Sequence, residues 1–232
     1  MEKRRDSATA YIILADGFET IEALTPLDVL RRCGVEVTTI SLNQTRAVRS
    51  SHGVTVEADA TMEEYLLKCS NAGSSTGASS TGTSTTGSRS TTAGNAGTSS
   101  SAGSSTTASS AVRQALILPG GYPGYKNLCE SAEVGALITQ FHKEGKLLCA
   151  ICGAPTALKA NQICRGAAIT CHTSVKEELS DYYSILSSAV VKYMNIITGM
   201  GAGRSLDFAF AIAEALTSKE KVEEIKAKME II

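Results

Sequence analysis

The stretch "LLCAICGAPTAL", residues 147–158, is the part of the chain that decides the fold. The apolar run 147–151 has the length and composition of a buried β-strand. Cys152 ends this run, and the small residues 153–155, the last of them a proline, lead directly into a helical pattern. Such a sharp strand-to-helix turn is typical of α/β proteins, and it places Cys152 on the turn itself.

The same order, an apolar strand followed by a helix, recurs on both sides of this stretch. We expect strands over residues 8–15, 35–42, 53–59 (near a sheet edge), 112–121 (ending in a Pro-Gly-Gly turn), 146–151, 166–171 and 190–199. We expect helices over residues 25–34, 61–69, 131–145, 205–218 and 219–229. In the first helix Thr25 is the expected N-cap, Pro26 the first helical residue and Gly34 the stop. This repeated order predicts an α/β fold with a mostly parallel sheet and helices on both faces.

Residues 70–111 interrupt this pattern. Apart from Arg89 they are only Ser, Thr, Gly, Ala and Asn, with no apolar periodicity. Such a composition buries too little apolar surface to offset the entropy of ordering. We therefore expect a disordered low-complexity insertion. The flanks 1–69 and 112–232 look incomplete alone and together have the length of one α/β domain.

The overall composition excludes several classes of protein. The chain has 232 residues, a formal net charge of -1 and 43% hydrophobic residues, which is typical of a globular domain with a sizeable core. The near-neutral charge gives no indication of nucleic-acid binding, and no apolar run is long enough to cross a membrane. Seven cysteines without framework spacing, and no secretory signal, indicate reduced thiols and a cytoplasmic protein.

The chemistry-bearing residues follow the predicted strands. In a parallel sheet, sites lie beyond the carboxyl ends of the strands, so residues after different strands meet at one edge. The residues expected at this edge are Glu19 and Glu22 after the first strand, Gly120 and Gly121 after the strand that follows the insertion, Cys152 with Gly153, and His172.

Together these residue types favour nucleophilic catalysis. A helix N-terminus favours a thiolate over a thiol at Cys152. The N–H groups of Gly121 and Gly153 could hold a developing oxyanion. A carboxylate of the first loop could exchange a proton with the sulfur, and His172 could polarise or shuttle protons.

Each feature also has a purely structural explanation. A strand-end cysteine is often a core residue, a Gly-Gly pair a turn, and a single histidine a hydrogen-bonded structural residue. Cys149 and Cys152 also form a C-x-x-C pattern, which could indicate a dithiol or, with Cys171 and His172, a metal site. We expect no metal, because Cys149 falls inside the strand and residues three apart in a strand point to opposite faces.

Four stretches resemble the ThiJ/PfpI superfamily, in the branch of the parkinsonism-associated protein deglycase, which is glyoxalase III-like. They are "LADGFETIEALTPLDVLRRCGVEVT", "LILPGGYPGYKNLCES", "AICGAPTAL" and "TGMGAGRSLDFAFAIAEAL". The resemblance implies a flavodoxin-like three-layer sandwich, a homodimer and no cofactor. It implies Cys152 as the reactive cysteine, Glu22 as its hydrogen-bonded partner, His172 beside it, Gly121 and Gly153 as backbone donors, and Glu19 at a second acidic position of the first loop.

The function implied is a cysteine-dependent enzyme acting on small reactive dicarbonyls or on glycated protein adducts, with protection against oxidative stress. The alternative is a non-enzymatic redox sensor or chaperone that works through oxidation of Cys152. A peptidase is disfavoured, because it would need a histidine immediately after the nucleophile and position 153 is glycine.

Overall fold

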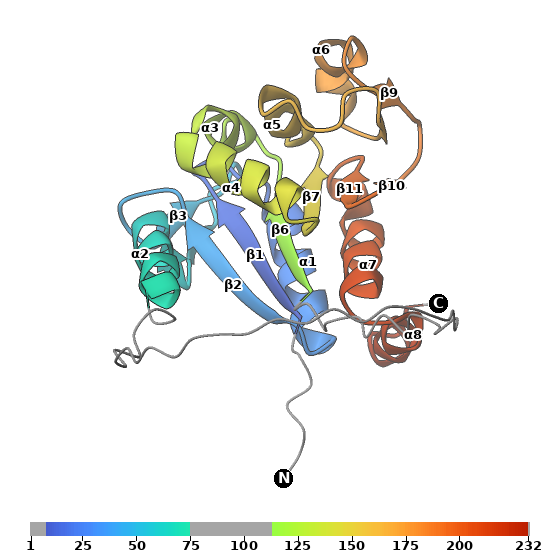
Figure 1. The fold of residues 1–232 in the computed structure, drawn as a ribbon. Helices are drawn as coiled ribbons and strands as arrows, with labels where there is room; N and C mark the ends of the chain where they lie inside the picture. Colours follow the sequence, from blue (N-terminus) through green and yellow to red (C-terminus); the bar gives the residue numbers. More distant parts are fainter. Residues whose placement is uncertain (1–7, 75–112, 232) are drawn as a thin grey trace, which may run out of the picture.

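A computed structural model describes residues 8–74 and 113–231 of the chain (Figure 1). The strands are β1 (Thr9–Leu14), β2 (Glu36–Ser41), β3 (Ala47–Arg49), β4 (Thr55–Glu57), β5 (Ala60–Thr61), β6 (Gln114–Leu118), β7 (Leu147–Ile151), β8 (Ala168–Ile169), β9 (Ser184–Ile185), β10 (Val190–Tyr193) and β11 (Ile196–Gly199). The helices are α1 (Thr20–Arg32), α2 (Met62–Ser74), α3 (Gly124–Glu130), α4 (Ala132–Lys143), α5 (Pro155–Ala160), α6 (Lys176–Ser180), α7 (Ser205–Leu216) and α8 (Lys219–Lys228), with 3-10 turns η1 (Thr173–Val175) and η2 (Ala202–Arg204).

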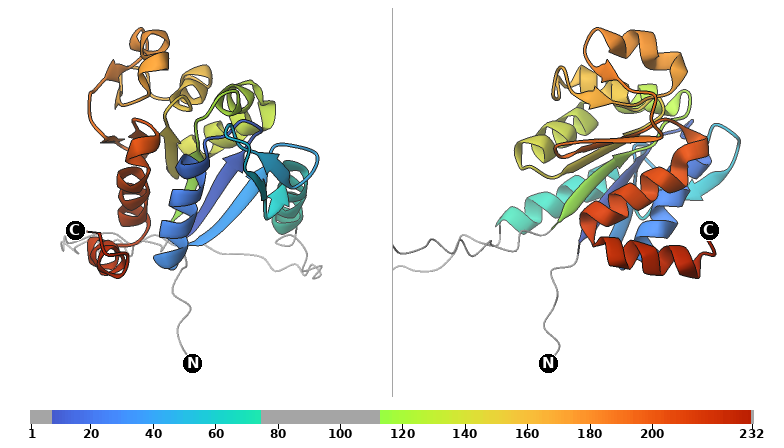
Figure 2. Two further views of the ribbon diagram at one scale, coloured as in Figure 1. Left: turned by 180° about the vertical axis from the view of Figure 1, so that it is seen from behind. Right: turned by 90° about the vertical axis from the view of Figure 1, so that its right-hand side faces the viewer.

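Seven strands form the central sheet, in the order β10-β11-β7-β6-β1-β2-β5. Every neighbouring pair is parallel except β10 with β11. Helices cover both faces of the sheet, as the views in Figures 1 and 2 show. The predicted fold class, a mostly parallel sheet between helical layers, is therefore confirmed.

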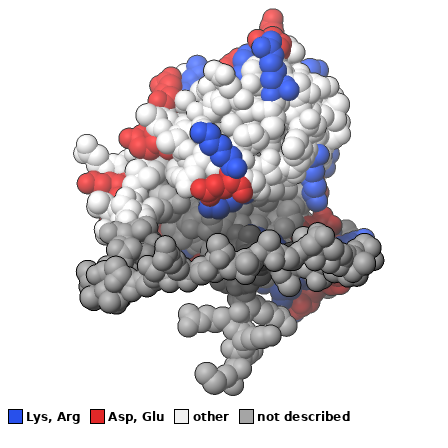
Figure 3. All heavy atoms as spheres, viewed as in Figure 1, with Lys and Arg blue, Asp and Glu red and all other residues white. Residues whose placement is uncertain are grey.

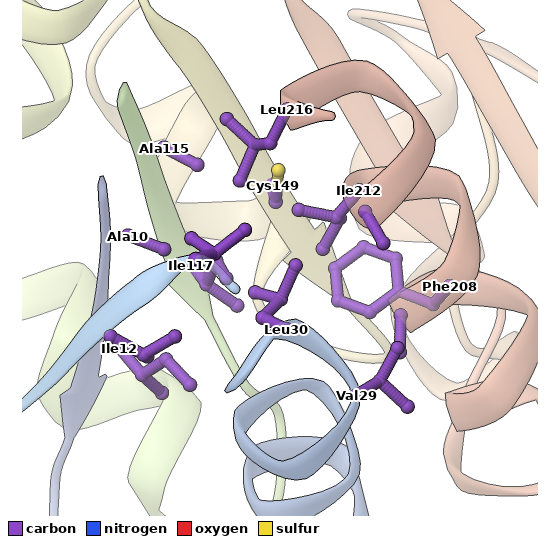
Figure 4. Close-up of a cluster of buried hydrophobic side chains, with 14 of the residues drawn as sticks. Ala10, Ile12, Val29, Leu30, Ala115, Ile117, Cys149, Phe208, Ile212 and Leu216 are labelled. Carbon is purple, nitrogen blue, oxygen red and sulfur yellow. The ribbon is translucent and has the colours of Figure 1, made fainter. Parts of the chain in front are cut away.

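The core is divided between the two faces of the sheet. Alternate side chains of the central strands pack against α1, α7 and α8 on one face, and against α2, α3, α4, α5 and α6 on the other. Figure 4 shows the first cluster, where Phe208 of α7 and Leu30 of α1 meet Ile117 and Cys149 of the sheet. Burying a side chain such as Phe208 contributes roughly 1.5–3 kcal/mol. This packing fixes α1 against the sheet, and α1 carries Glu22.

The start of α1 differs from the prediction. The helix begins at Thr20, five residues before the expected cap at Thr25, and Pro26 lies inside it. The reason is that the Glu19 side chain accepts a hydrogen bond from the backbone N–H of Glu22 and so caps an earlier first turn. Pro26 is the seventh of the thirteen residues of α1, so it lies beyond the first turn and removes one N–H donor from the helix interior.

Three predicted strands are also wrong in part. Segment 53–59 is no edge of the main sheet, because its residues in β4 pair with β3 in a separate hairpin. Segment 166–171 contains only the two-residue β8, which pairs with β9 outside the main sheet. Segment 190–199 is a hairpin of β10 and β11, broken at Met194, which has a φ of 50°. Strands this short have too few residues to show an alternation of buried and exposed side chains, so the local sequence does not predict which strand they pair with.

The predicted insertion over 70–111 falls largely outside the described residues. Its first five residues belong to α2, which runs to Ser74 rather than ending at residue 69. Ser70 is accommodated there because its hydroxyl donates to the carbonyl of Leu66, one turn earlier.

Candidate active site

Cys152 lies on a strained turn at the carboxyl edge of the sheet. β7 ends at the preceding residue, and Cys152 has a φ of 65°, in the left-handed region that non-glycine residues seldom adopt. Its N–H donates to the carbonyl of Gly199 at 3.0 Å, and its carbonyl accepts from the N–H of His172 at 2.9 Å. These two bonds hold the backbone on both sides, so the strain is maintained by the surrounding fold. The sulfur stays partly exposed.

Two glycine N–H groups face this sulfur. The N–H groups of Gly121 and Gly153 donate to the Cys152 sulfur, and both act to lower its pKa. Gly121 has a φ of 90°, and a Cβ there would overlap the backbone of the first loop, so no other residue fits without a shift. The structure thus brings together the two backbone donors that the sequence predicts.

Glu22 supplies the buried carboxyl of the site. It is fully buried on α1, and its Oε2 accepts from the N–H of Gly120 at 2.8 Å. Its Oε1 is buried without a hydrogen bond of standard geometry, although the Cys152 thiol is close enough to lower the carboxyl pKa. Burial is the larger influence and raises the pKa of Glu22 to about 7.

Gly120 separates the thiol from the carboxyl. A Cβ at this position would lie 2.7 Å from the Cβ of Cys152 and 2.7 Å from Oε2 of Glu22. The absence of a side chain at Gly120 is therefore what allows α1 and the β7 turn to approach each other. Nothing in the sequence pattern singles out this glycine from its neighbour Gly121.

The thiol itself is not a simple thiolate. Burial, followed by the charge and hydrogen bond of Glu22, raises the pKa of Cys152 to about 12. The sequence predicts the opposite direction from the neighbouring helix N-terminus. However, α5 has only six residues and begins at Pro155, three residues beyond the sulfur's own position. Near neutral pH the thiol therefore keeps its proton, while the neighbouring carboxyl of Glu22 changes its charge.

Glu19 supports this pair from the first loop. Its carboxylate accepts from the N–H of Glu22 at 2.8 Å, and its N–H donates to the carbonyl of Gly120 at 2.9 Å. Its negative charge also raises the pKa of Glu22. Glu19 thereby fixes both the start of α1 and the loop after β6.

His172 reaches the site through its backbone. Its N–H holds the Cys152 carbonyl, while the ring is exposed. Nδ1 of the ring accepts a hydrogen bond from the backbone N–H of Ser174 at 3.2 Å and lies 2.8 Å from the Ser174 hydroxyl. Nδ1 therefore caps the short turn η1, and Nε2 is the ring atom available for proton transfer.

Three clefts on the described surface have linings that do not include Cys152. Clefts of about 730, 670 and 420 Å³ run along α4, between α7 and α8, and beside α2. On the face in Figure 3 the described charged side chains are of both signs. Among residues 8–74 and 113–231, no group of three or more His, Cys, Asp or Glu side chains is placed to hold a metal ion. In the same ranges, no helix is long and apolar enough to cross a membrane.

Comparison with known proteins gives one consistent result. The DJ-1/PfpI family profile matches residues 8–215. Protein dj-1beta of Drosophila melanogaster is 31% identical over 220 residues, covering 94% of this chain and 95% of that protein. The crystal structure of Drosophila melanogaster DJ-1beta aligns with a TM-score of 0.76 at 30% identity, covering 97% of this chain and 99% of that one. A Caenorhabditis elegans protein named glutathione-independent glyoxalase DJR-1.2 is 38% identical over 107 residues, 46% of this chain and 56% of its own.

Proposed function

Because the chain belongs to the DJ-1/PfpI family, we propose that it is a cofactor-free, cysteine-dependent enzyme acting on reactive dicarbonyls such as methylglyoxal, or on their early glycation adducts. The observation that carries the proposal is the pairing of Cys152 with the buried Glu22 beneath two glycine N–H donors. The glyoxalase named among the relatives supports the same chemistry. We also propose that the protein is a cytoplasmic homodimer and that it protects against oxidative stress.

The first step is attack on the aldehyde. The Cys152 sulfur bonds to the aldehyde carbon of methylglyoxal while its proton passes to the ionised Glu22. A carboxyl with a pKa near 7 is half ionised at neutral pH, and it can take the proton while the sulfur bonds to carbon, so that no free thiolate has to form. The carbonyl oxygen becomes an oxyanion, which the N–H groups of Gly121 and Gly153 stabilise.

The second step moves hydrogen between adjacent carbons. Glu22 returns its proton to the oxyanion, which gives a hemithioacetal. Glu22 then removes the proton from the former aldehyde carbon while the ketone oxygen is protonated, which gives an enediol. The former ketone carbon takes the proton back from Glu22 and the former aldehyde hydroxyl loses its proton, with His172 Nε2 assisting the exchange between the two oxygens. The result is a 2-hydroxy thioester of Cys152. Water then cleaves the carbon–sulfur bond, releasing lactate and restoring the thiol, so the net change is the addition of one water.

The direct test is lactate formation from methylglyoxal by the purified, reduced protein without glutathione or added metal. We expect Cys152→Ala to abolish lactate formation. The matched control is Cys69→Ala, since Cys69 is an exposed cysteine on α2, and it should retain the full rate. Lactate formation at an undiminished rate by Cys152→Ala would refute the mechanism.

A redox-sensing function is the second candidate, favoured by the partly exposed sulfur beside a carboxyl that is partly protonated at neutral pH. One peroxide would convert the Cys152 thiol to a sulfenic acid and water, and a second would give the sulfinic acid, which ionises to the sulfinate. Protonated Glu22 would then donate a hydrogen bond to the sulfinate. Peptide mass spectrometry after mild peroxide should show two added oxygens at Cys152 ahead of the other six cysteines; uniform oxidation of the exposed thiols would contradict this function.

A further inference from the structure

Tyr125 occupies the space that a side chain at position 153 would fill. A Cβ on Gly153 would lie 2.7 Å from Cδ1, 2.8 Å from Cγ and 2.9 Å from Cε1 of Tyr125. The aromatic ring therefore lies directly on the backbone of Gly153. Since the N–H of Gly153 also donates to the Cys152 sulfur, the ring is one residue away from the reacting atom.

The position of this ring is fixed by the backbone. The N–H of Tyr125 donates to the carbonyl of Gly121 at 2.9 Å. The preceding residue, Gly124, packs so closely on the first loop that a Cβ would lie 2.6 Å from the N of Phe18. The start of α3 is thus held against the loop between β1 and α1. Tyr125 contacts both glycines that face the sulfur, one through its backbone and the other through its ring.

The surface beside Tyr125 is also aromatic. The Tyr122 ring lies 6.3 Å from that of Tyr125, and Tyr122 is 66% exposed. The ammonium of Lys126 lies 5.4 Å from the centre of the Tyr122 ring. Tyr125 is only partly buried, and burial raises its pKa, with the nearby Cys152 among the further causes. The side of Gly153 that faces α3 is therefore covered by the Tyr125 ring, with the Tyr122 ring beside it.

We propose that Tyr125 is a specificity-determining residue of this site: its ring forms an aromatic wall beside Cys152 that favours electrophiles carrying a planar aromatic group over those carrying a small alkyl group. For the enzyme this means arylglyoxals or aromatic 2-oxoaldehydes in preference to methylglyoxal. That extension to substrates rests on the proposed function, whereas the wall itself does not. An aromatic pair favours the matching ligand by roughly two- to twelve-fold beyond its buried area.

The experiment compares two probes that carry the same reactive maleimide group. Cys152 is alkylated with N-phenylmaleimide or N-ethylmaleimide, and the rate of each is followed by peptide mass spectrometry. We expect the phenyl-to-ethyl rate ratio at Cys152 to fall by about two- to twelve-fold in Tyr125→Leu and to stay unchanged in Tyr125→Phe, which keeps the ring. Tyr193→Leu, on the distant β10, is the matched control and should leave the ratio unchanged. Cys69 in the same molecules reports any difference in intrinsic reactivity.

A second substitution displaces the Tyr125 ring by changing the glycine on which it packs. Gly153→Ala places a methyl group where the Tyr125 ring lies, and should lower the ratio as Tyr125→Leu does. An unchanged ratio at Cys152 in Tyr125→Leu, or an equal fall at Cys69, would overturn the proposal. Measuring turnover of phenylglyoxal and methylglyoxal distinguishes a failure of the Tyr125 proposal from a failure of the proposed function. If the unaltered protein turns over neither phenylglyoxal nor methylglyoxal, the enzyme proposal fails, while the maleimide ratio still decides the role of Tyr125.

Discussion

Replacing Glu22 by glutamine should stabilise the protein in a pH-dependent way. Glu22 is fully buried, and its pKa in the folded chain is raised from 4.5 to about 7, chiefly by burial. Glutamine keeps a side-chain oxygen that can accept from the N–H of Gly120, but it carries no charge at any pH. The substitution therefore removes the cost of burying an ionised carboxylate and retains most of the packing.

The size of the effect follows from the two pKa values. Below pH 4.5 the carboxyl is protonated in both the folded and the unfolded chain, so Glu22 contributes its full stability there. Between pH 4.5 and about 7 the unfolded chain ionises while the folded chain stays protonated, and stability falls by about 1.4 kcal/mol per pH unit. Above pH 7 the loss is complete and amounts to roughly 3 kcal/mol. Glu22→Gln does not undergo this loss.

The assay is urea unfolding of both proteins at pH 4.5, 5.5, 6.5, 7.5 and 8.5, under reducing conditions. The free energy of unfolding of Glu22→Gln, relative to the unaltered protein, should rise by about 3 kcal/mol across this series and level off above pH 7.5. The same comparison with Glu63→Gln, an exposed carboxyl in the first turn of α2, should be nearly flat. A difference for Glu22→Gln that does not change with pH would refute the assignment of a raised pKa to this residue.

Substitutions at three further positions test how the site is held together. Gly120→Ala should destabilise the fold by about 1–3 kcal/mol, because its Cβ would overlap Cys152 and Glu22; Gly203→Ala, which meets no atom within 4 Å, should leave the thermal midpoint unchanged. Glu19→Ala should lower the free energy of unfolding by about 1 kcal/mol, because it removes the cap of α1; urea unfolding measures this loss. Glu19→Gln should retain the cap and lower the pKa of Glu22, because it removes a nearby charge; a pH titration measures this shift. Thr156→Val should cost about 1 kcal/mol in urea unfolding, because the Thr156 hydroxyl donates to the Gly153 carbonyl in a buried 2.7 Å bond; equal stability would show that this bond does not support the turn.

The interior of the fold could be predicted from sequence because its strands are continuous apolar runs. Segment 147–151 is buried on both faces of the sheet, and its pattern alone is enough to place Cys152 on the turn. The predicted ends of helices are wrong where a polar side chain outside the apolar pattern determines where the helix begins. Glu19 starts α1 early by capping it, and no spacing rule distinguishes a capping glutamate from a solvated one.

The candidate site was predictable as a set of residues but not in its electrostatics. The strand ends gave the positions of Cys152, Gly121 and Glu22, because parallel strands end at one edge. The direction of the thiol pKa depends first on how deeply Cys152 is buried and then on how close the Glu22 carboxyl lies to the sulfur. Both depend on Gly120, which acts by lacking a side chain, and on Tyr125, whose ring covers Gly153. Contacts of this kind arise only once three elements are packed together.

The central claim is that Cys152 and Glu22 act as one acid–base pair, and the pH dependence of kcat/KM for methylglyoxal tests it most directly. For the unaltered protein kcat/KM should rise about tenfold per pH unit below pH 7 and level off above it, as Glu22 ionises. Glu22→Gln should lose both the rate and the break in the profile, and Cys152→Ala should show no turnover at any pH. A profile without a break near pH 7, or one that Glu22→Gln leaves unchanged, would contradict the account.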